Sequence, residues 1–273
     1  MGERSRVRRS LTAALATGVT LDYVQQGDPT GLPVVLLPGL SDSWRSFEPM
    51  LAELPACLPV VAVSQRGHGQ SSCPGSGYRP RDYAGDVISF LDALGIGRAV
   101  LVGHSSSCFT ARLVAACHPR RTAGLVLIAS PLALQGSPAA TEMSTVLDAL
   151  EDPVPAAFVR DFTRSAVGPS VSLSFLDAMV LESRSVPARV WRETFRGLLD
   201  YDDGGSLHRV VAPTLLVWGD ADGLVPRDDQ DVLAKALTSS RLLVYTATGH
   251  SPHWEHPSRL AADVTAFVRG LAA

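Results

Sequence analysis

The stretch that most constrains the fold is a buried strand that passes into a helix through a turn containing Ser105. Residues 99–102 form a continuous apolar run typical of a strand, and residues 108–117 carry apolar side chains at helical spacing. A serine between two such elements fits a nucleophile elbow, whose strained backbone lifts the hydroxyl out of the sheet. The positions two residues away must be small because strand and helix nearly touch there. Gly103 meets this requirement, whereas Ser107 stands where the usual pattern has a second glycine.

Apolar runs and helical patterns alternate along the chain on both sides of this turn, as expected for a mostly parallel α/β sheet flanked by helices. A hairpin is predicted over residues 10–26. Further strands are predicted at residues 34–37, 60–63, 125–128, 214–218 and 242–245, and further helices up to residue 54 and at 81–94, 229–237 and 257–271.

The alternation stops after residue 130, and residues 131–208 carry helical patterns at 155–165, 171–181 and 188–199. We therefore expect an α/β core made of residues 1–130 and 209–273, with a helical cap of residues 131–208 inserted between two strands.

Composition excludes several classes of protein. A chain of 273 residues can bury a large core, and its formal net charge of -3 gives no reason to expect nucleic acid or a membrane as partner. No apolar run approaches the roughly 20 residues of a membrane span. The basic start (Arg4, Arg6, Arg8 and Arg9) is followed by an apolar segment too short for an export signal.

The four cysteines (Cys57, Cys73, Cys108 and Cys117) form no C-x-x-C pair, so no zinc or redox motif is indicated. Their apolar contexts predict reduced core residues of a cytoplasmic protein.

A serine hydroxyl is a weak nucleophile until an imidazole takes its proton. His250 is the candidate base because it lies on the loop directly after the last predicted strand. We expect the neighbouring His253 to line the pocket or to pack, and His256 to cap the helix that starts at Pro257. Three other histidines are expected to be structural: His104, His118 and His208.

A carboxylate is needed to orient that imidazole, and Asp220 and Asp222 both follow the strand at 214–218. Asp222 is preferred because it lies farther out on the loop, whereas Asp220 is expected to bond local backbone. The other place for an acid, residues 129–131 after the strand at 125–128, holds no carboxylate.

The oxyanion of an acyl-transfer reaction needs two fixed N–H donors. The N–H of Ser106 is one candidate because it lies at a helix N-terminus, where the helix dipole favours negative charge. The N–H of Leu40 is the other, on the loop after the strand at 34–37. Carboxyl ends of parallel strands meet at one edge of a sheet, so these loops should converge.

Five loops together resemble those of the α/β-hydrolase fold superfamily, and specifically its small capped serine hydrolases of the esterase and lactonase kind. They are Pro38-Gly39-Leu40, Arg66-Gly67-His68-Gly69-x-Ser71, the elbow at Ser105, Gly219-x-x-Asp222-x-x-Val225-Pro226, and Gly249-His250-x-x-x-x-Glu255-x-Pro257. The resemblance implies a triad of Ser105, Asp222 and His250, with no cofactor and no metal. The chain departs from the usual pattern at Pro38, where histidine is common, and at Ser107.

Aspartate is the nucleophile of the superfamily's dehalogenases and epoxide hydrolases, so Ser105 argues against both. We therefore expect hydrolysis of a small carboxylic ester or lactone through an acyl-serine intermediate. A carbon–carbon bond hydrolase of ring-cleavage products is an alternative, because residues 254–256 resemble that subgroup and Arg184 could bind a carboxylate. A slow-turnover small-molecule sensor with the same triad is another, because residues 104–107 and 249–253 look somewhat like such relatives.

The cap should decide the substrate. Six apolar side chains are candidates for joining cap to core or lining an apolar pocket: Trp44, Phe162, Phe175, Met179, Leu181 and Trp191. Residues 200–203 are expected to form a solvated return loop. The protein is expected to be a monomer or a homodimer acting on a small molecule.

Overall fold

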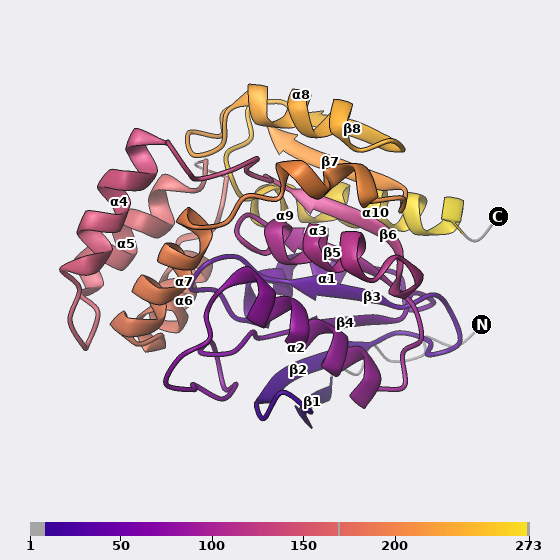
Figure 1. Cartoon of the computed structure of the whole chain (residues 1–273), viewed down its shortest axis with the longest axis horizontal. Coiled ribbons are helices and arrows are strands. Elements are labelled where there is room, and N and C mark those ends of the chain that lie inside the picture. Colours follow the sequence, from indigo (N-terminus) through magenta and orange to yellow (C-terminus); the bar gives the residue numbers. More distant parts are fainter. Residues whose placement is uncertain (1–8, 169, 272–273) are drawn as a thin grey trace.

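The computed structural model describes residues 9–168 and 170–271, and an eight-stranded sheet forms its centre (Figure 1). The strand order is β1-β2-β4-β3-β5-β6-β7-β8. The β1–β2 and β2–β4 pairs are antiparallel, and every other neighbouring pair is parallel. The predicted mostly parallel α/β sheet is thus confirmed. The strands are β1 (Arg9–Ala14), β2 (Thr20–Gln26), β3 (Val34–Leu37), β4 (Val60–Val63), β5 (Ala99–His104), β6 (Thr122–Ile128), β7 (Thr214–Gly219) and β8 (Ser240–Tyr245).

Helices cover both faces of the sheet and form two separate apolar layers. One layer packs α2, α3 and α8 against the sheet, and the other packs α1 and α10 against its opposite face. The helices of the core are α1 (Glu48–Glu53), α2 (Pro80–Ala93), α3 (Ser107–Cys117), α8 (Arg227–Ala236), α9 (Pro252–Glu255) and α10 (Pro257–Leu271). The short helix α9, directly after His250, was not predicted from the sequence.

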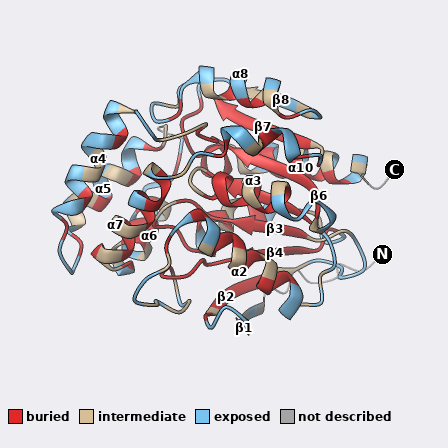
Figure 2. Ribbon diagram, viewed as in Figure 1, coloured by how far each residue is buried: buried red, intermediate tan, exposed pale blue. Residues whose placement is uncertain are grey.

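The central strands read as uninterrupted apolar runs because they are covered on both faces. Every residue of β3, β4, β5 and β6 is buried, and Figure 2 shows this buried centre in red. The edge strand β8 is only partly buried.

Four α-helices lie between β6 and β7, together beyond one end of the sheet (Figure 1). They are α4 (Pro138–Asp148), α5 (Ala156–Ser165), α6 (Leu173–Ser185) and α7 (Ala188–Leu199). The helix α4 was not predicted from the sequence. Trp191 of α7 packs its ring against Phe158 and Phe162 of α5, at centroid distances of 5.6 and 5.2 Å. These four helices therefore share an apolar cluster, to which Tyr78 and Tyr83 of the α/β core also contribute.

Two expectations about burial are wrong. Cys57, Cys73 and Cys117 are exposed, since they lie in turns or at a helix end, and only Cys108 is buried. Asp203 is buried rather than solvated: its carboxylate pairs with Arg112 of α3, with Nε and Oδ2 2.8 Å apart and both side chains almost fully buried.

Three arginines of the basic start, Arg4, Arg6 and Arg8, lie outside the described residues. Across the described part of the chain, no helix combines the length and apolar character needed to cross a membrane.

Candidate active site

Ser105 occupies a strained turn between β5 and α3. Its φ of 51° lies in the left-handed region that non-glycine residues rarely adopt. Its N–H is held by the carbonyl oxygen of Ile128 at 2.9 Å. A Cβ on Gly103 would lie 2.8 Å from the carbonyl oxygen of Ser107, so strand and helix touch at this point. Strain maintained by surrounding contacts is typical of a functional serine.

His250 and Asp222 come together at the carboxyl ends of β7 and β8. Nδ1 of His250 lies 2.9 Å from Oδ2 of Asp222, and the Asp222 carboxylate is fully buried. The other carboxylate oxygen, Oδ1, accepts hydrogen bonds from the N–H groups of Leu224 (2.8 Å) and Val225 (3.0 Å). These two bonds fix the carboxylate, so it can hold the imidazole in one orientation and one tautomer.

The loops that carry Asp222 and His250 are bonded to each other. Oδ1 of Asp220 accepts from the N–H of Ala247 at 2.6 Å, so this side chain bonds backbone of the neighbouring loop. A Cβ on Gly219 would lie 2.2 Å from the carbonyl oxygen of Thr248. Only glycine therefore permits so close an approach of the loop that carries Asp222 to the loop that carries His250.

His104 links the base loop to the serine turn. Its Nε2 lies 3.0 Å from the carbonyl oxygen of His250, and the two rings are 5.1 Å apart. Since His104 directly precedes Ser105, this bond holds His250 beside the serine. Among the described residues no hydrogen bond joins Ser105 Oγ to His250, and catalytic contacts of this kind commonly tighten only when substrate binds.

His253 is fully buried, and neither of its ring nitrogens has a hydrogen-bond partner within the described residues. Its ring packs against His104 (4.3 Å) and Phe47 (5.0 Å). Burial lowers the pKa of both His253 and His104, the latter to about 3, so both rings are neutral at pH 7. Possible metal-ligand atoms of Asp42, His104 and His253 lie within 4.8 Å of one another. Within the described residues, these three side chains are therefore the candidate ligands for a metal ion.

The loop after β3 carries Leu40, and the turn before α3 carries Ser106. Neither backbone N–H donates a hydrogen bond to another described residue, so both are free to hold an oxyanion. Gly39 is required beside them, since a Cβ there would lie 2.8 Å from Nδ1 of His104.

Gln65, which the sequence motifs did not single out, fastens this loop together with Ser107. Nε2 of Gln65 donates to the carbonyl oxygen of Pro38 (3.1 Å) and to Oγ of Ser107 (2.9 Å), while Ser107 Oγ itself donates to the Pro38 carbonyl. The two departures from the usual pattern therefore contact each other.

Two glutamates tie the cap region to the site loops. Glu182 of α6 accepts from Ser43 Oγ at 2.7 Å, on the loop that follows Leu40. Glu255 of α9 accepts from the N–H of Gly249 (2.9 Å) and from the N–H of Gly168 (3.0 Å). No local sequence signal marks Glu182, because its partner is 139 residues away.

The residues expected to join cap to core or to line a pocket lie in several different packed surroundings. The indole N–H of Trp44 donates to Asp22 at 3.1 Å within the core, and Trp191 lies inside the cap core. Leu181 is 66% exposed. Phe175 and Met179 pack around Trp254, next to the base loop.

A small cavity lies instead between the sheet edge and α7. None of the expected substrate contacts Trp44, Phe175, Met179, Trp191 and His253 is among its lining residues. The lining comes from the Leu40 loop, the loop after β4 and three helices: Gly39, Leu40, Gln65, His68, Tyr83, Ser106, Ser107, Thr110, Thr194 and Leu198.

The chain is similar to known proteins both in sequence and in structure. A family model described as "Alpha/beta hydrolase family" matches residues 34–264. The non-heme chloroperoxidase of Streptomyces lividans is 29% identical over 282 residues, covering 94% of this chain and 99% of that protein. A 2-hydroxy-6-oxononadienedioate/2-hydroxy-6-oxononatrienedioate hydrolase of Burkholderia vietnamiensis is 30% identical over 231 residues, covering 77% of this chain and 76% of that protein. The structure of the esterase RhEst1 from Rhodococcus sp. ECU1013 has a TM-score of 0.86 at 26% identity, covering 96% of this chain and 99% of that chain.

Proposed function

Since the chain belongs to the α/β-hydrolase family, we propose that it hydrolyses a small carboxylic ester or lactone through an acyl-serine intermediate on Ser105. The observation that carries the proposal is the bond of His250 Nδ1 to the buried Asp222 carboxylate, on a loop held beside the strained Ser105. An imidazole oriented in this way has Nε2 available as a base for a serine hydroxyl.

In the proposed mechanism, Ser105 Oγ attacks the carbonyl carbon while His250 takes the hydroxyl proton. Negative charge develops on the carbonyl oxygen, and the N–H groups of Leu40 and Ser106 stabilise it. His250 then protonates the leaving alcohol, which leaves the acyl group on Ser105. A water molecule, deprotonated by His250, attacks the acyl-enzyme. His250 returns this proton to Ser105 Oγ as the bond between Oγ and the acyl carbon breaks, and the acid is released. Every step uses side chains and backbone of this chain alone.

A second candidate is hydrolysis of a carbon–carbon bond, which is favoured by the 30% identity to the Burkholderia hydrolase. The residues that suggested this alternative, Arg184 and residues 254–256, contact other parts of the protein in the structure. Nε of Arg184 donates to the carbonyl oxygen of Val154 at 3.4 Å, and Glu255 accepts from Gly249 and Gly168. Ester or lactone hydrolysis therefore remains the preferred proposal, and the Rhodococcus esterase is a full-length structural relative that agrees with it.

The test is turnover of p-nitrophenyl acetate and butyrate by the wild type and by Ser105→Ala, together with mass-spectrometric labelling by a p-nitrophenyl phosphonate. We expect multiple turnovers that the variant loses, and one phosphonate adduct on Ser105. The exposed Ser165→Ala is the matched control and should keep both properties. Full esterase activity in Ser105→Ala would overturn the mechanism. A single slow turnover with a ligand-dependent melting temperature would favour the sensor alternative.

A further inference from the structure

The cavity lined by Leu40 and Ser106 also contains buried polar side chains. Its floor contains Gln65 and His68 from the loop after β4, and its far side is closed by Thr194 and Leu198 of α7. Both Gln65 and His68 are buried, and each has one side-chain atom without a hydrogen-bond partner in the described structure: Oε1 of Gln65 and Nε2 of His68.

The orientation of the Gln65 amide follows from its partners. Nε2 lies 3.1 Å from the carbonyl oxygen of Pro38, and a carbonyl oxygen can only accept a hydrogen bond. The amide nitrogen must therefore be on this side. Oε1 is left as an acceptor with no donor.

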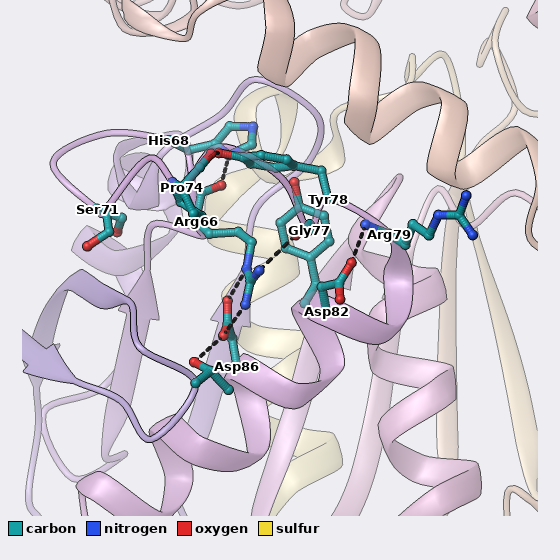
Figure 3. A network of polar contacts seen from close by, with 12 residues as sticks. Arg66, His68, Ser71, Pro74, Gly77, Tyr78, Arg79, Asp82 and Asp86 are labelled. Atoms are coloured by element: carbon teal, nitrogen blue, oxygen red, sulfur yellow. Dashed lines mark hydrogen bonds and ion pairs between the residues drawn. The ribbon is translucent and has the colours of Figure 1, made fainter.

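The His68 tautomer is fixed in the same way. Nδ1 lies 2.8 Å from the carbonyl oxygen of Arg66, so Nδ1 carries the proton. Burial lowers the pKa of His68 to about 4, so the ring is neutral at pH 7 and Nε2 presents a lone pair. In Figure 3 the His68 ring lies at one end of the network, apart from the Arg66–Asp86 pair. That buried pair, with both of its contacts at 2.6 Å, keeps the loop in place.

The other polar groups that line the cavity are paired only in part. The hydroxyl groups of Tyr83 and Thr194 bond each other at 2.7 Å. The two buried side-chain atoms of the lining that lack a partner, Oε1 of Gln65 and Nε2 of His68, are both acceptors. Buried acceptors without a donor cost free energy, so this cavity is complementary to a small group that donates, which a hydroxyl does.

We propose that this cavity is a subsite for a hydroxyl group on the acyl part of the substrate, and that the preferred substrates are esters or lactones of short hydroxy acids. The proposal rests on the proposed ester hydrolysis. The leaving alcohol must lie near His250, which protonates it, and His250 does not line the cavity. Leu40 and Ser106, which would hold the carbonyl oxygen, do line it. We assign the hydroxyl to the second or third carbon of the acyl chain, because the carbonyl oxygen and the hydroxyl would then occupy the same cavity.

The test compares pairs of ethyl esters that differ only in the hydroxyl: lactate with propionate, and 3-hydroxybutyrate with butyrate. Acid release is followed by pH-stat titration. We expect the wild-type kcat/KM to favour the hydroxy ester of at least one pair about 10-fold or more, because its hydroxyl pairs acceptors that the other ester leaves unpaired.

The variant His68→Asn removes Nε2, one of the two acceptors, and the ratio of the two kcat/KM values should fall about threefold or more, since one of the hydrogen bonds that produce the preference is lost. His208→Asn, at an exposed histidine, is the matched control and should keep the wild-type ratio. Should His68→Asn not fold, product inhibition of the wild type replaces it, with lactate expected to bind more tightly than propionate.

Equal hydrolysis of both members of each pair by the wild type would mean that the cavity holds only water, and would overturn the subsite while leaving the ester hydrolase intact. A preference that is undiminished in His68→Asn would overturn it as well. If no ester is hydrolysed and no phosphonate adduct forms on Ser105, the proposed function itself fails.

Discussion

The hydroxyl of Ser107 donates a hydrogen bond to the carbonyl oxygen of Pro38, and these are the two positions at which the chain departs from the usual pattern of its family. A glycine at position 107 would have no group to make this bond. The serine therefore connects the first turn of α3 directly to the loop that carries Leu40. Gln65 supports the same bond by donating to both partners.

We expect Ser107→Ala to lower kcat for p-nitrophenyl acetate about 10-fold with little change in KM, because oxyanion donors act mainly in the transition state. Ser89→Ala is the control: Ser89 is also buried and accepts a bond from the N–H of Ala16, far from the site. It should alter the melting temperature but not kcat. An unchanged kcat in Ser107→Ala would show that Gln65 alone holds the loop.

Asp222→Asn should lower kcat by about 1,000- to 10,000-fold, because an amide cannot hold the imidazole in the tautomer that accepts the serine proton. Asp220→Asn is the matched control on the same loop, since its amide oxygen can still accept from the N–H of Ala247. It should retain kcat within about threefold. Steady-state kinetics on one ester decide between the two aspartates, and equal losses would contradict the assignment of Asp222 as the acid.

Gly219→Ala should destabilise the protein by about 3 kcal/mol, because its Cβ would lie 2.2 Å from a backbone carbonyl oxygen that cannot move without displacing the base loop. Gly223→Ala, four residues later, meets nothing within 4 Å and should cost less than about 1 kcal/mol. Urea unfolding at pH 7 measures both. Similar stabilities would mean that the two loops are farther apart than described.

Stability should rise with pH between about 4 and 6.5. His68 and His104 have pKa values lowered to about 4 and about 3 by burial, so in this range the unfolded chain binds protons that the native state does not. For His68 alone the gain is about 3 kcal/mol. Burial also raises the pKa of Asp42 to about 7, which opposes this trend because the native state then holds the extra proton.

Urea unfolding at pH 4.5, 5.5 and 6.5 measures this slope. Asp42→Asn removes the opposing contribution, so the free energy of unfolding should climb more steeply with pH in the variant than in the wild type. A wild-type stability that is flat across this range would contradict the burial of neutral histidines.

Asp203→Ala should cost about 3–5 kcal/mol, because it leaves the guanidinium of Arg112 buried without its carboxylate. Asp202→Ala is the neighbouring control: Asp202 is exposed and accepts only from the N–H of Gly204. Its removal should cost about 1 kcal/mol. Thermal unfolding at neutral pH distinguishes the two, and equal costs would return residues 200–203 to the solvated loop predicted from sequence.

The strands of the sheet, the hairpin and the succession of strands along the chain could be predicted from the sequence, because strand and helix periodicity are properties of consecutive residues. The same holds for the loops around Ser105, Asp222 and His250. Each lies at the carboxyl end of a predicted strand, and parallel pairing brings such ends to one edge of the sheet. The need for a small residue at Gly103 could also be predicted, because strand and helix approach each other closely on either side of such a turn.

Tertiary structure alone decided what surrounds those loops. The pairing of Arg112 with Asp203 spans 91 positions, and the contact of Ser107 with Pro38 spans 69. Neither leaves a periodic trace in the chain. Packing also directed Trp44 and Trp191 into apolar cores, since an aromatic side chain is equally suited to a core and to a pocket wall. Burial without partners, as at Gln65 Oε1 and His68 Nε2, exists only once distant segments have enclosed the atom.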